Sequence, residues 1–233
     1  MNLNKFKKEL TVVILCGGKG LRLRPITKDI PKPLIKINNK SILENIIRFF
    51  LKYKIQNFII ATGYKHKIID NFISSKFKKH NIITVYTGLN SDIIKRLEKV
   101  SPYSKKNLLV CYGDTMVNLN LNKYINFYLS NIKKVLITSY QLKSNFGILD
   151  VNNNDDVVNF NEKPKLDIWF NVGYLMFTSD QFHYFKKFTI FQNLLKYLSR
   201  KKIMKTYKHK GKHITINTVT ELEKAKQEIK KFN

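Results

Sequence analysis

The chain has 233 residues, of which 43% are hydrophobic and 25% charged, and this globular composition excludes an intrinsically disordered or collagen-like protein. Its 43 Lys and Arg against 16 Asp and Glu give a formal charge of +27, which favours anionic partners without choosing between nucleic acid and small phosphates. The longest apolar runs fall far short of the roughly 20 residues that a membrane helix needs, so we expect no bilayer span. No small-residue cleavage site follows the basic N-terminal residues, and we therefore expect a retained N-terminus and a cytoplasmic protein.

Strands and helices alternate in the first half of the chain. The apolar run 10–15 predicts a buried strand, followed by a glycine-rich loop and a short extended piece over 34–37. Ser41 and Glu44 form a capping-box pattern, which predicts the start of a helix. The other elements expected in this half are strands over 58–62, 82–86 and 108–112 and helices over 68–77 and 93–100. This alternation is typical of a largely parallel sheet covered by helices.

The pattern changes in the second half, after a helix expected over 121–130. A strand over 135–142 leads to the segments 146–151 and 157–160, which we expect to pair antiparallel across a turn at 152–156. The remaining expected elements are a strand over 169–177, helices over 181–185 and 191–199, a strand over 203–207 and a closing helix introduced by a capping box at Thr218 and Glu221. No linker, repeat or low-complexity tail interrupts the chain, so residues 1–233 are predicted to form a single α/β domain with antiparallel elements in its second half.

The cysteines and histidines give no metal-binding pattern. Cys16 and Cys111 each end a predicted strand and lie in no Cys-x-x-Cys spacing, so we expect buried free thiols. His209 and His213 are four residues apart, but Gly211 between them argues against a helical pair of zinc ligands. We therefore expect no zinc site.

A glycine-rich loop directly follows the first predicted strand. Gly17, Gly18 and Gly20 leave room for backbone N–H groups to close on an anion, and Arg22 offers a planar fork of donors for phosphate oxygens. The loop lacks the ending of a Walker A motif and is not a clean dinucleotide fingerprint. Taken alone, it is equally compatible with a tight turn.

A second motif, Pro31-Lys32-Pro33-Leu34, follows a few residues later. Its two prolines are expected to hold the backbone extended and to present Lys32 to the same anion. Together with Gly17-Gly18-x-Gly20-x-Arg22-Leu23-x-Pro25-x-Thr27, this motif resembles the N-terminal signature of the sugar-phosphate nucleotidyltransferases. The resemblance continues in order and spacing through Ile59-Ile60-Ala61-Thr62-Gly63-Tyr64, Tyr112-Gly113-Asp114, Phe146-Gly147, Phe160-Asn161-Glu162-Lys163-Pro164, Asn171-Val172-Gly173 and His209-x-Gly211.

Three of these neighbourhoods, around Gly63, Glu162 and His209, are particularly similar to the glucose-1-phosphate cytidylyltransferases. The resemblance implies a Rossmann-like nucleotidyltransferase fold with a mixed, mostly parallel central sheet flanked by helices. It divides the chain into a nucleotide-binding half, 1–115, and an acceptor-binding half, 116–233.

The reaction that the resemblance implies is transfer of a nucleoside monophosphate, with CMP from CTP favoured, to a sugar 1-phosphate. Pyrophosphate is released and a nucleotide-activated sugar forms, as in nucleotide-sugar and polysaccharide biosynthesis. Mg²⁺ is the implied cofactor, and no covalent enzyme intermediate is expected, because the chain shows no nucleophile constellation.

The resemblance also implies roles for individual residues. Arg22, Lys32 and Asp114 are the expected catalytic residues, with Arg22 on the leaving pyrophosphate and Lys32 at the transferring centre. Asp114 and Asn217 are the expected metal ligands. The nucleotide is expected at Gly17, Gly18, Gly20, Arg22 and Lys32, and the acceptor at Gly147, Glu162, Lys163, Asn171 and Gly173.

The chain departs from the subfamily pattern at three places. The subfamily has a metal-binding Asp where this chain has Asn217, and an amide brings no charge to a hard divalent ion, so metal affinity is expected to fall unless substrate phosphates complete the coordination. Only Arg96 and Leu97 remain of a Thr-Gly-Gly-Arg-Leu stretch, and the connection before it is shorter.

Two other interpretations of the sequence stay open. The chain is alternatively a cytidylyltransferase for a non-sugar acceptor such as phosphocholine or a phosphonate, or a catalytically impaired homologue that binds a nucleotide sugar. Nucleic-acid binding is disfavoured despite the charge, because no recognisable nucleic-acid module accompanies it. A homo-oligomer is compatible with the resemblance, but no sequence feature fixes a subunit count.

Overall fold

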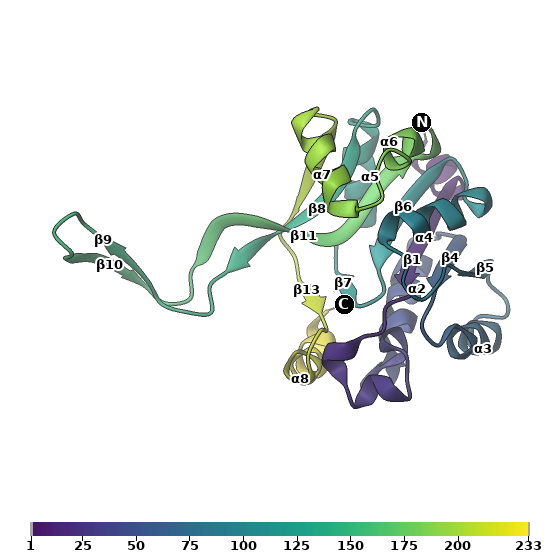
Figure 1. Ribbon diagram of the computed structural model, residues 1–233, viewed down its shortest axis with the longest axis horizontal. Helices are drawn as coiled ribbons and strands as arrows, with labels where there is room; N and C mark the ends of the chain where they lie inside the picture. The colour runs from purple at the N-terminus through teal and green to yellow at the C-terminus, as the bar shows by residue number, and fades with distance from the viewer. Residues whose placement is uncertain (1, 233) are drawn as a thin grey trace.

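A seven-stranded sheet forms the centre of the computed structural model, which describes residues 2–232 (Figure 1). Its strand order is β12-β8-β11-β6-β1-β4-β5, and neighbouring strands are parallel except at β11, which runs antiparallel to β6 and β8. The strands are β1 (Leu10–Cys16), β4 (Asn57–Thr62), β5 (Ile82–Tyr86), β6 (Asn107–Tyr112), β8 (Val135–Lys143), β11 (Lys165–Thr178) and β12 (Met204–His209). The expected mixed, mostly parallel sheet is confirmed.

Side-chain alternation along β1 shows how the sheet is buried on both faces. Val12 and Ile14 belong to one apolar cluster and Val13 to the other, because successive strand residues point to opposite sides. Burial on both sides explains why these strands are continuous apolar runs in the sequence.

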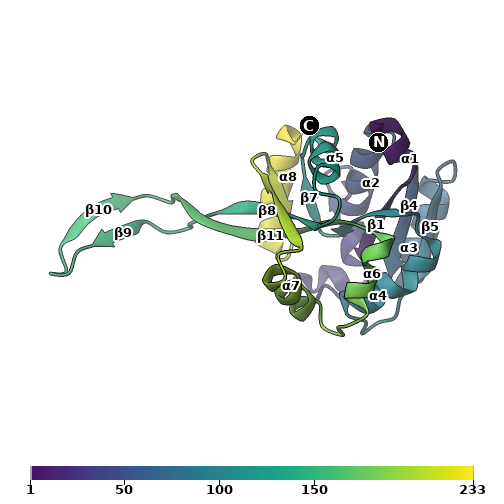
Figure 2. The same ribbon diagram turned by 90° about the horizontal axis from the view of Figure 1, so that it is seen from above.

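Helices cover both faces (Figures 1 and 2). On one side lie α1 (Leu3–Lys8), α2 (Ile42–Lys52), α3 (His66–Lys76), α5 (Leu121–Leu129) and α8 (Val219–Glu228), and on the other α4 (Ile93–Val100), α6 (Phe182–Phe185) and α7 (Phe191–Arg200). In residues 2–232, no helix has both the length and the apolarity that crossing a membrane requires.

Several local predictions differ from the structure. Residues Lys32–Leu34 form a 3-10 turn rather than an extended piece, and the strand β2 that follows covers only Lys36–Ile37, paired with β3 (Lys40–Ser41). At the start of α2, the Ser41 hydroxyl accepts from the Glu44 N–H at 3.1 Å, as in a capping box. The Glu44 carboxylate instead accepts from Arg48 at 2.8 Å, so only half of that motif forms. At α8 both halves of the predicted box form.

Two short strands were not predicted. β7 (Thr115–Val117) and β13 (His213–Thr215) pair antiparallel beside the carboxyl end of the central sheet. Three residues are too short to give a periodic signal, and their pairing joins segments almost a hundred residues apart. This pairing places Asn217 next to Asp114, as described below.

A hairpin projects from the body of the molecule. β9 (Ile148–Val151) and β10 (Val157–Asn161) pair antiparallel, as predicted, and form the tip of an extension that β8 and β11 carry away from the sheet (Figures 1 and 2). We refer to residues 146–162 as the arm. Every residue of β10 is exposed, so the arm adds nothing to the two cores.

A substitution at Ile60 tests whether the central sheet is buried as described. The Ile60 side chain is 0% exposed in β4, and Ile60→Ala is expected to lower the free energy of unfolding by about 2–5 kcal/mol, because it removes buried methyl groups and leaves a cavity. Urea denaturation measures the change. Ile190→Ala, at a side chain 49% exposed, is the matched control and should stay within about 0.5 kcal/mol of the unaltered protein. Equal losses for the two variants would contradict the burial described.

Candidate active site

A cavity of about 600 Å³ opens at the carboxyl ends of β1 and β6. Parallel α/β sheets commonly bind ligands at this edge. The residues predicted for the nucleotide, for catalysis and for metal all line this single cavity: Gly17, Gly18, Gly20, Arg22, Lys32, Asp114 and Asn217. The structure therefore brings together residues that lie up to 200 positions apart in the chain.

The glycine loop packs directly on its neighbours. Gly20 has φ +64°, a left-handed conformation that glycine adopts without strain, and it precedes the 3-10 turn Leu21–Leu23. Its carbonyl accepts from the Thr27 hydroxyl at 2.9 Å. A Cβ at position 20 would lie 3.1 Å from the Cβ of Lys32, so the glycine lets the lysine pass beneath the loop.

Four polar side chains from separate segments meet in the cavity. The Lys32 ammonium donates to the Asp114 carboxylate at 2.5 Å and to the Asn217 amide oxygen at 3.1 Å. That same amide oxygen accepts from the Arg22 guanidinium at 2.9 Å. The Lys32 and Asp114 side chains are 12% and 26% exposed, so they face the cavity rather than open solvent.

The cavity is positively charged. Among the described residues that line it, Asp114 is the one carboxylate, against the cations Arg22, Lys32 and Arg96. Cys16 also lines it, but burial raises the pKa of its thiol, so it stays a protonated, free thiol rather than a nucleophile. Cys111 is likewise buried and free, as predicted. This balance suits an anion with several charges, such as a phosphate chain.

The two residues expected to hold Mg²⁺ each carry an oxygen-bearing group. Asp114 contributes a carboxylate and Asn217 an amide oxygen, both ligand types that a hard divalent cation accepts. Asn217 is fixed where its backbone N–H donates to the Glu221 carboxylate at the start of α8. No group of three or more His, Cys, Asp and Glu capable of holding a metal occurs in residues 2–232. These two ligands fit an ion that draws its other oxygens from bound phosphates.

Arg96 is a site residue to which sequence analysis gave no role. It lies on α4 with only 7% exposure and donates to Thr87 Oγ1 at 2.5 Å and to the carbonyls of Gly88 at 3.1 Å and Gly17 at 3.3 Å. Burial lowers the pKa of the guanidinium. A Cβ at Gly17 would collide with this side chain, so Arg96 supports the glycine loop from below. The one feature of the sequence that could have indicated a role for Arg96 is that Arg96 and Leu97 match the end of the subfamily's Thr-Gly-Gly-Arg-Leu stretch.

Two of the five predicted acceptor residues lie beside the cavity. Gly173 has φ +78°, and a Cβ there would collide with the ring of Tyr112, which lines the cavity. The Asn171 side chain accepts from the Gly173 N–H at 2.8 Å and closes this bulge in β11. Burial raises the pKa of Tyr112. Asn171 and Gly173 therefore help to position the Tyr112 ring, which forms part of the cavity wall.

The other three predicted acceptor residues are not at this cavity. Gly147 and Glu162 lie on the arm and Lys163 follows it, in the part that projects from the body (Figure 2). Glu162 and Lys163 form an ion pair of 3.2 Å with side chains 59% and 57% exposed. Within one chain, the structure does not bring these residues to the site.

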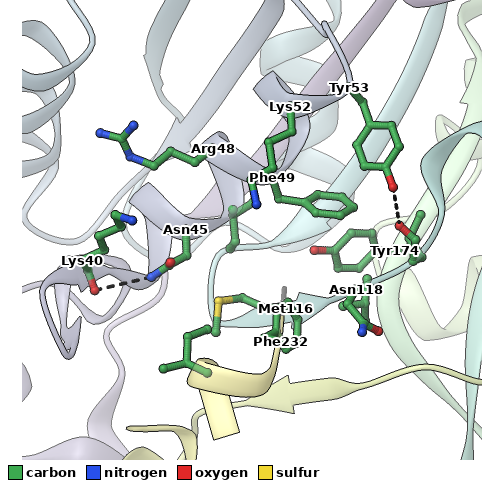
Figure 3. Close-up of a pocket in the computed structure, with 14 residues that line it drawn as sticks. Lys40, Asn45, Arg48, Phe49, Lys52, Tyr53, Met116, Asn118, Tyr174 and Phe232 are labelled. Atoms are coloured by element: carbon green, nitrogen blue, oxygen red, sulfur yellow. Dashed lines mark hydrogen bonds between the residues drawn. The ribbon is translucent and has the colours of Figure 1, made fainter.

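A second cavity, of about 300 Å³, lies between α2, β7 and the C-terminal turn (Figure 3). The rings of Phe49 and Tyr53 point into it, and the Tyr53 hydroxyl donates to the Leu119 carbonyl at 3.4 Å. None of the predicted site residues lines it, and none of its described lining residues is acidic. The second cavity therefore lacks the carboxylate and the predicted phosphate-binding residues that line the first cavity.

The fold and the first cavity define an α/β protein with a positively charged pocket at the carboxyl edge of its sheet. A family model described as nucleotidyl transferase matches residues 11–222. A probable glucose-1-phosphate cytidylyltransferase of Bacillus subtilis is 29% identical over 91% of this chain and 93% of its own. The D-glycero-alpha-D-manno-heptose 1-phosphate guanylyltransferase of Campylobacter jejuni is 32% identical over 76% of this chain and 79% of its own. The chain belongs to the nucleotidyl transferase family, as its motifs predicted.

Solved structures agree on the fold. A protein of Bacillus anthracis, provisionally named a glucose-1-phosphate thymidylyltransferase and solved with sucrose, superposes with a TM-score of 0.76 at 18% identity, over 96% of each chain. HddC from Yersinia pseudotuberculosis gives 0.70 at 23% identity, over 94% of this chain and 99% of its own. The expected fold is thereby confirmed.

Arg96→Lys tests the support of the glycine loop. A lysine has no planar fork to reach several acceptors at once, so buried oxygens lose donors and the free energy of unfolding is expected to fall by about 1–3 kcal/mol. Nucleotide affinity, measured by titration, should fall with it. Arg200→Lys, at an exposed arginine at the end of α7, is the control and should change neither quantity. If Arg96→Lys matched that control, the supporting role would be wrong.

The burial of His213 predicts that the free energy of unfolding decreases in acid. His213 packs against Tyr140 and Phe170, and burial lowers its pKa to about 4, with a further lowering from His209. The unfolded chain takes up this proton near pH 6.5, whereas the folded chain does so only near pH 4, so stability is full above 6.5 and falls as the pH drops toward 4. Up to about 2 kcal/mol should be lost between pH 7 and 5.

The matched variant for this prediction is His213→Phe, which keeps a ring and removes the titration. Its melting temperature should fall less steeply between pH 7 and 5 than that of the unaltered protein. Parallel profiles would show that His213 does not carry the pH dependence.

Proposed function

We propose that this chain transfers a nucleoside monophosphate, CMP from CTP in the first instance, to a sugar 1-phosphate, with Mg²⁺ as cofactor. The single observation that carries the proposal is the convergence of Arg22, Lys32 and Asp114 beside the glycine loop in one positively charged cavity. Family membership supports the nucleotidyl transfer, and the names of the Bacillus and Campylobacter relatives support a sugar 1-phosphate as acceptor.

The proposed reaction is an in-line displacement. A phosphate oxygen of the acceptor forms a bond to the α-phosphorus of the nucleotide, the bond from that phosphorus to the β-phosphate oxygen breaks, and pyrophosphate leaves with the electron pair. Negative charge gathers on the phosphate oxygens, so the protein has to supply positive charge and positioning rather than a nucleophile.

Different residues of the cavity would supply the positive charge and the positioning. In this proposal Lys32, beneath the loop, would stabilise charge at the α-phosphorus, and Arg22, at the exposed rim, would contact the leaving pyrophosphate. Backbone N–H groups of the loop are available to phosphate oxygens. Asp114 and Asn217 would hold Mg²⁺, which when bound neutralises phosphate oxygens and orients them.

The base and the acceptor each have an alternative. Relatives are named as cytidylyltransferases in Bacillus subtilis and Salmonella typhimurium and as a guanylyltransferase in Campylobacter jejuni, so guanosine is the alternative to cytidine. Phosphocholine and phosphonates are alternative acceptors for the same chemistry. A binding protein with impaired catalysis is the alternative that Asn217 favours, because the metal site then holds one carboxylate.

Lys32→Ala tests the catalytic assignment. Loss of a preorganised charge at the reacting centre is expected to lower kcat by roughly 10²–10³-fold, with a much smaller change in nucleotide affinity. Pyrophosphate release with CTP, glucose 1-phosphate and Mg²⁺ measures the rate. Lys28→Ala, at an exposed lysine of the same loop, is the control. An effect confined to the nucleotide Kd would give Lys32 a binding role instead.

Asn217→Asp tests the impaired-site alternative. The change adds a second carboxylate beside Asp114, so Mg²⁺ affinity should rise, and turnover at limiting Mg²⁺ should rise with it if the amide limits activity. The Mg²⁺ concentration for half-maximal pyrophosphate release is the quantity to compare. An unaltered value would show that Asn217 does not limit metal use.

A further inference from the structure

Cations precede every parallel strand of the central sheet. The six parallel strands, β1, β4, β5, β6, β8 and β12, all enter the sheet at one edge, opposite the edge that holds the first cavity. The five residues before each of these strands include two or three Lys or Arg. We call these six segments the amino edge: residues 5–9, 52–56, 77–81, 102–106, 130–134 and 199–203.

The charge of the amino edge exceeds what the lysine-rich composition explains. Its 30 residues hold 13 Lys, Arg200 and one acid, Glu9, a formal charge of +13, whereas the other 203 residues together carry +14. The five residues after each of the same six strands hold only five cations, with one acid. A uniform excess of lysine would load both ends of the strands alike. The fold therefore gathers positive charge at one edge of the sheet.

Cations from different segments of the amino edge lie close together. The Lys105 ammonium donates to the carbonyl of Lys8 at 3.0 Å. The Lys7 ammonium lies over the ring of Tyr53, 5.8 Å from its centroid. Burial and the nearby ammonium of Lys54 lower the pKa of Lys7. Segments that are far apart in the sequence thus form one continuous basic surface.

Little negative charge balances this surface. Glu98 near the end of α4 and Asp180 after β11 lie beside it. Lys52 aside, none of its cations takes part in an ion pair within residues 2–232. Eleven of its 13 lysines are exposed. Cations crowded in this way repel one another, and an anionic partner would relieve the repulsion.

The acidic part of the chain lies away from the amino edge. The arm has no Lys or Arg and four acids, a formal charge of −4, against +31 for the rest of the chain. β8 begins at the amino edge and leads to the arm from its other end, and Figure 2 shows the arm projecting away from α1. An anionic surface can therefore approach the amino edge without meeting the acids of the arm.

The breadth of the amino edge fits an extended surface. Seven neighbouring strands about 4.8 Å apart span roughly 30 Å, and cations stand before both outermost strands, β12 and β5. Lysine carries a compact charge on a flexible stem, which meets scattered phosphates without a fixed geometry. Tyr103 and Ile132, which are 61% and 37% exposed, lie among these lysines. Apolar and aromatic side chains beside lysines are suited to the headgroup layer of a membrane.

We propose that the amino edge docks this protein on the surface of an anionic lipid bilayer, with Tyr103 and Ile132 at the level of the headgroups. Such docking needs no spanning helix, because clustered lysines are attracted to acidic headgroups. The first cavity lies at the opposite edge of the sheet, so it stays open to dissolved ligands. The docking is independent of the proposed function.

Vesicle sedimentation tests the docking. At ~0.15 M salt the protein should pellet with vesicles of phosphatidylcholine containing about one-third phosphatidylserine, and should stay in solution with phosphatidylcholine alone. Binding should weaken steeply as salt is raised toward ~0.5 M, because salt screens the attraction. Equal partition onto the two kinds of vesicle, or none onto either, would overturn the proposal.

A pair of lysine substitutions localises the contact. Lys105→Gln with Lys106→Gln removes two charges from the middle of the amino edge, and should lower the partition coefficient on anionic vesicles at least about tenfold. Lys36→Gln with Lys67→Gln removes the same charge from exposed lysines of β2 and of the first turn of α3, and should lower it less than about threefold. Circular dichroism checks that both variants are folded. Equal losses for the two pairs would contradict docking through this edge.

Tyr103→Ser with Ile132→Ser tests the headgroup contact without changing the charge. Loss of the apolar contact should lower the partition coefficient at least about threefold. Ile190→Ser, at a side chain 49% exposed before α7, is the control and should leave the partition coefficient unaltered. A loss no larger than that of the control would show that these two side chains do not reach the bilayer.

Competition with nucleic acid decides between the two kinds of polyanion. Duplex and single-stranded DNA of about 20 nucleotides, added at the same phosphate concentration as the anionic lipid, should leave the protein on the vesicles. Release of the protein by the DNA would assign the amino edge to nucleic acid and overturn the proposal.

Discussion

The site depends on one ion pair, between Lys32 and Asp114. The two residues are 82 positions apart, and their 2.5 Å contact joins the loop after β1 to the loop after β6. A glycine packs closely beside each of the two segments: a Cβ at Gly20 would lie 3.1 Å from the Cβ of Lys32, and a Cβ at Gly113, the residue before Asp114, would lie 2.7 Å from the Cys16 sulfur. The pair balances two charges that face a partly closed cavity, where an unpaired charge is costly. Asn217 joins the pair from a third segment, so the pocket forms only when distant parts of the chain have folded together.

Much of this could be predicted from the sequence, because the signals are local. Apolar runs predicted the strands of the central sheet, and the glycine loop with Lys32 and Asp114 predicted the residues of the cavity. What escaped prediction depends on contacts between distant segments. Arg96 is one example, since only the folded chain shows its guanidinium beneath Gly17. The pairing of β7 with β13 is another, since each strand is too short to be periodic. The projection of the arm escaped as well, since a hairpin pattern does not say which surface the hairpin packs against.

Charge organises the molecule at two scales. Within the cavity, three cations surround one carboxylate, which suits a polyphosphate better than a neutral ligand. Across the chain, a body of +31 carries an arm of −4. The excess of lysine thus need not indicate nucleic acid, because a positively charged cavity suits a small anionic ligand.

The proposed function requires this cavity to recognise one nucleoside triphosphate. A thermal-shift comparison of CTP, dTTP, UTP, GTP and ATP with Mg²⁺ at ~0.15 M salt tests it most directly, because screening beyond roughly 8 Å suppresses loose charge attraction and no acceptor has to be chosen. A nucleotide at about 100 times its Kd stabilises the folded state by roughly 2.7 kcal/mol, which raises the melting temperature by several degrees in a domain of this size. CTP is expected to raise the melting temperature more than the other four nucleotides. Equal shifts for all five, or no shift for any, would contradict it.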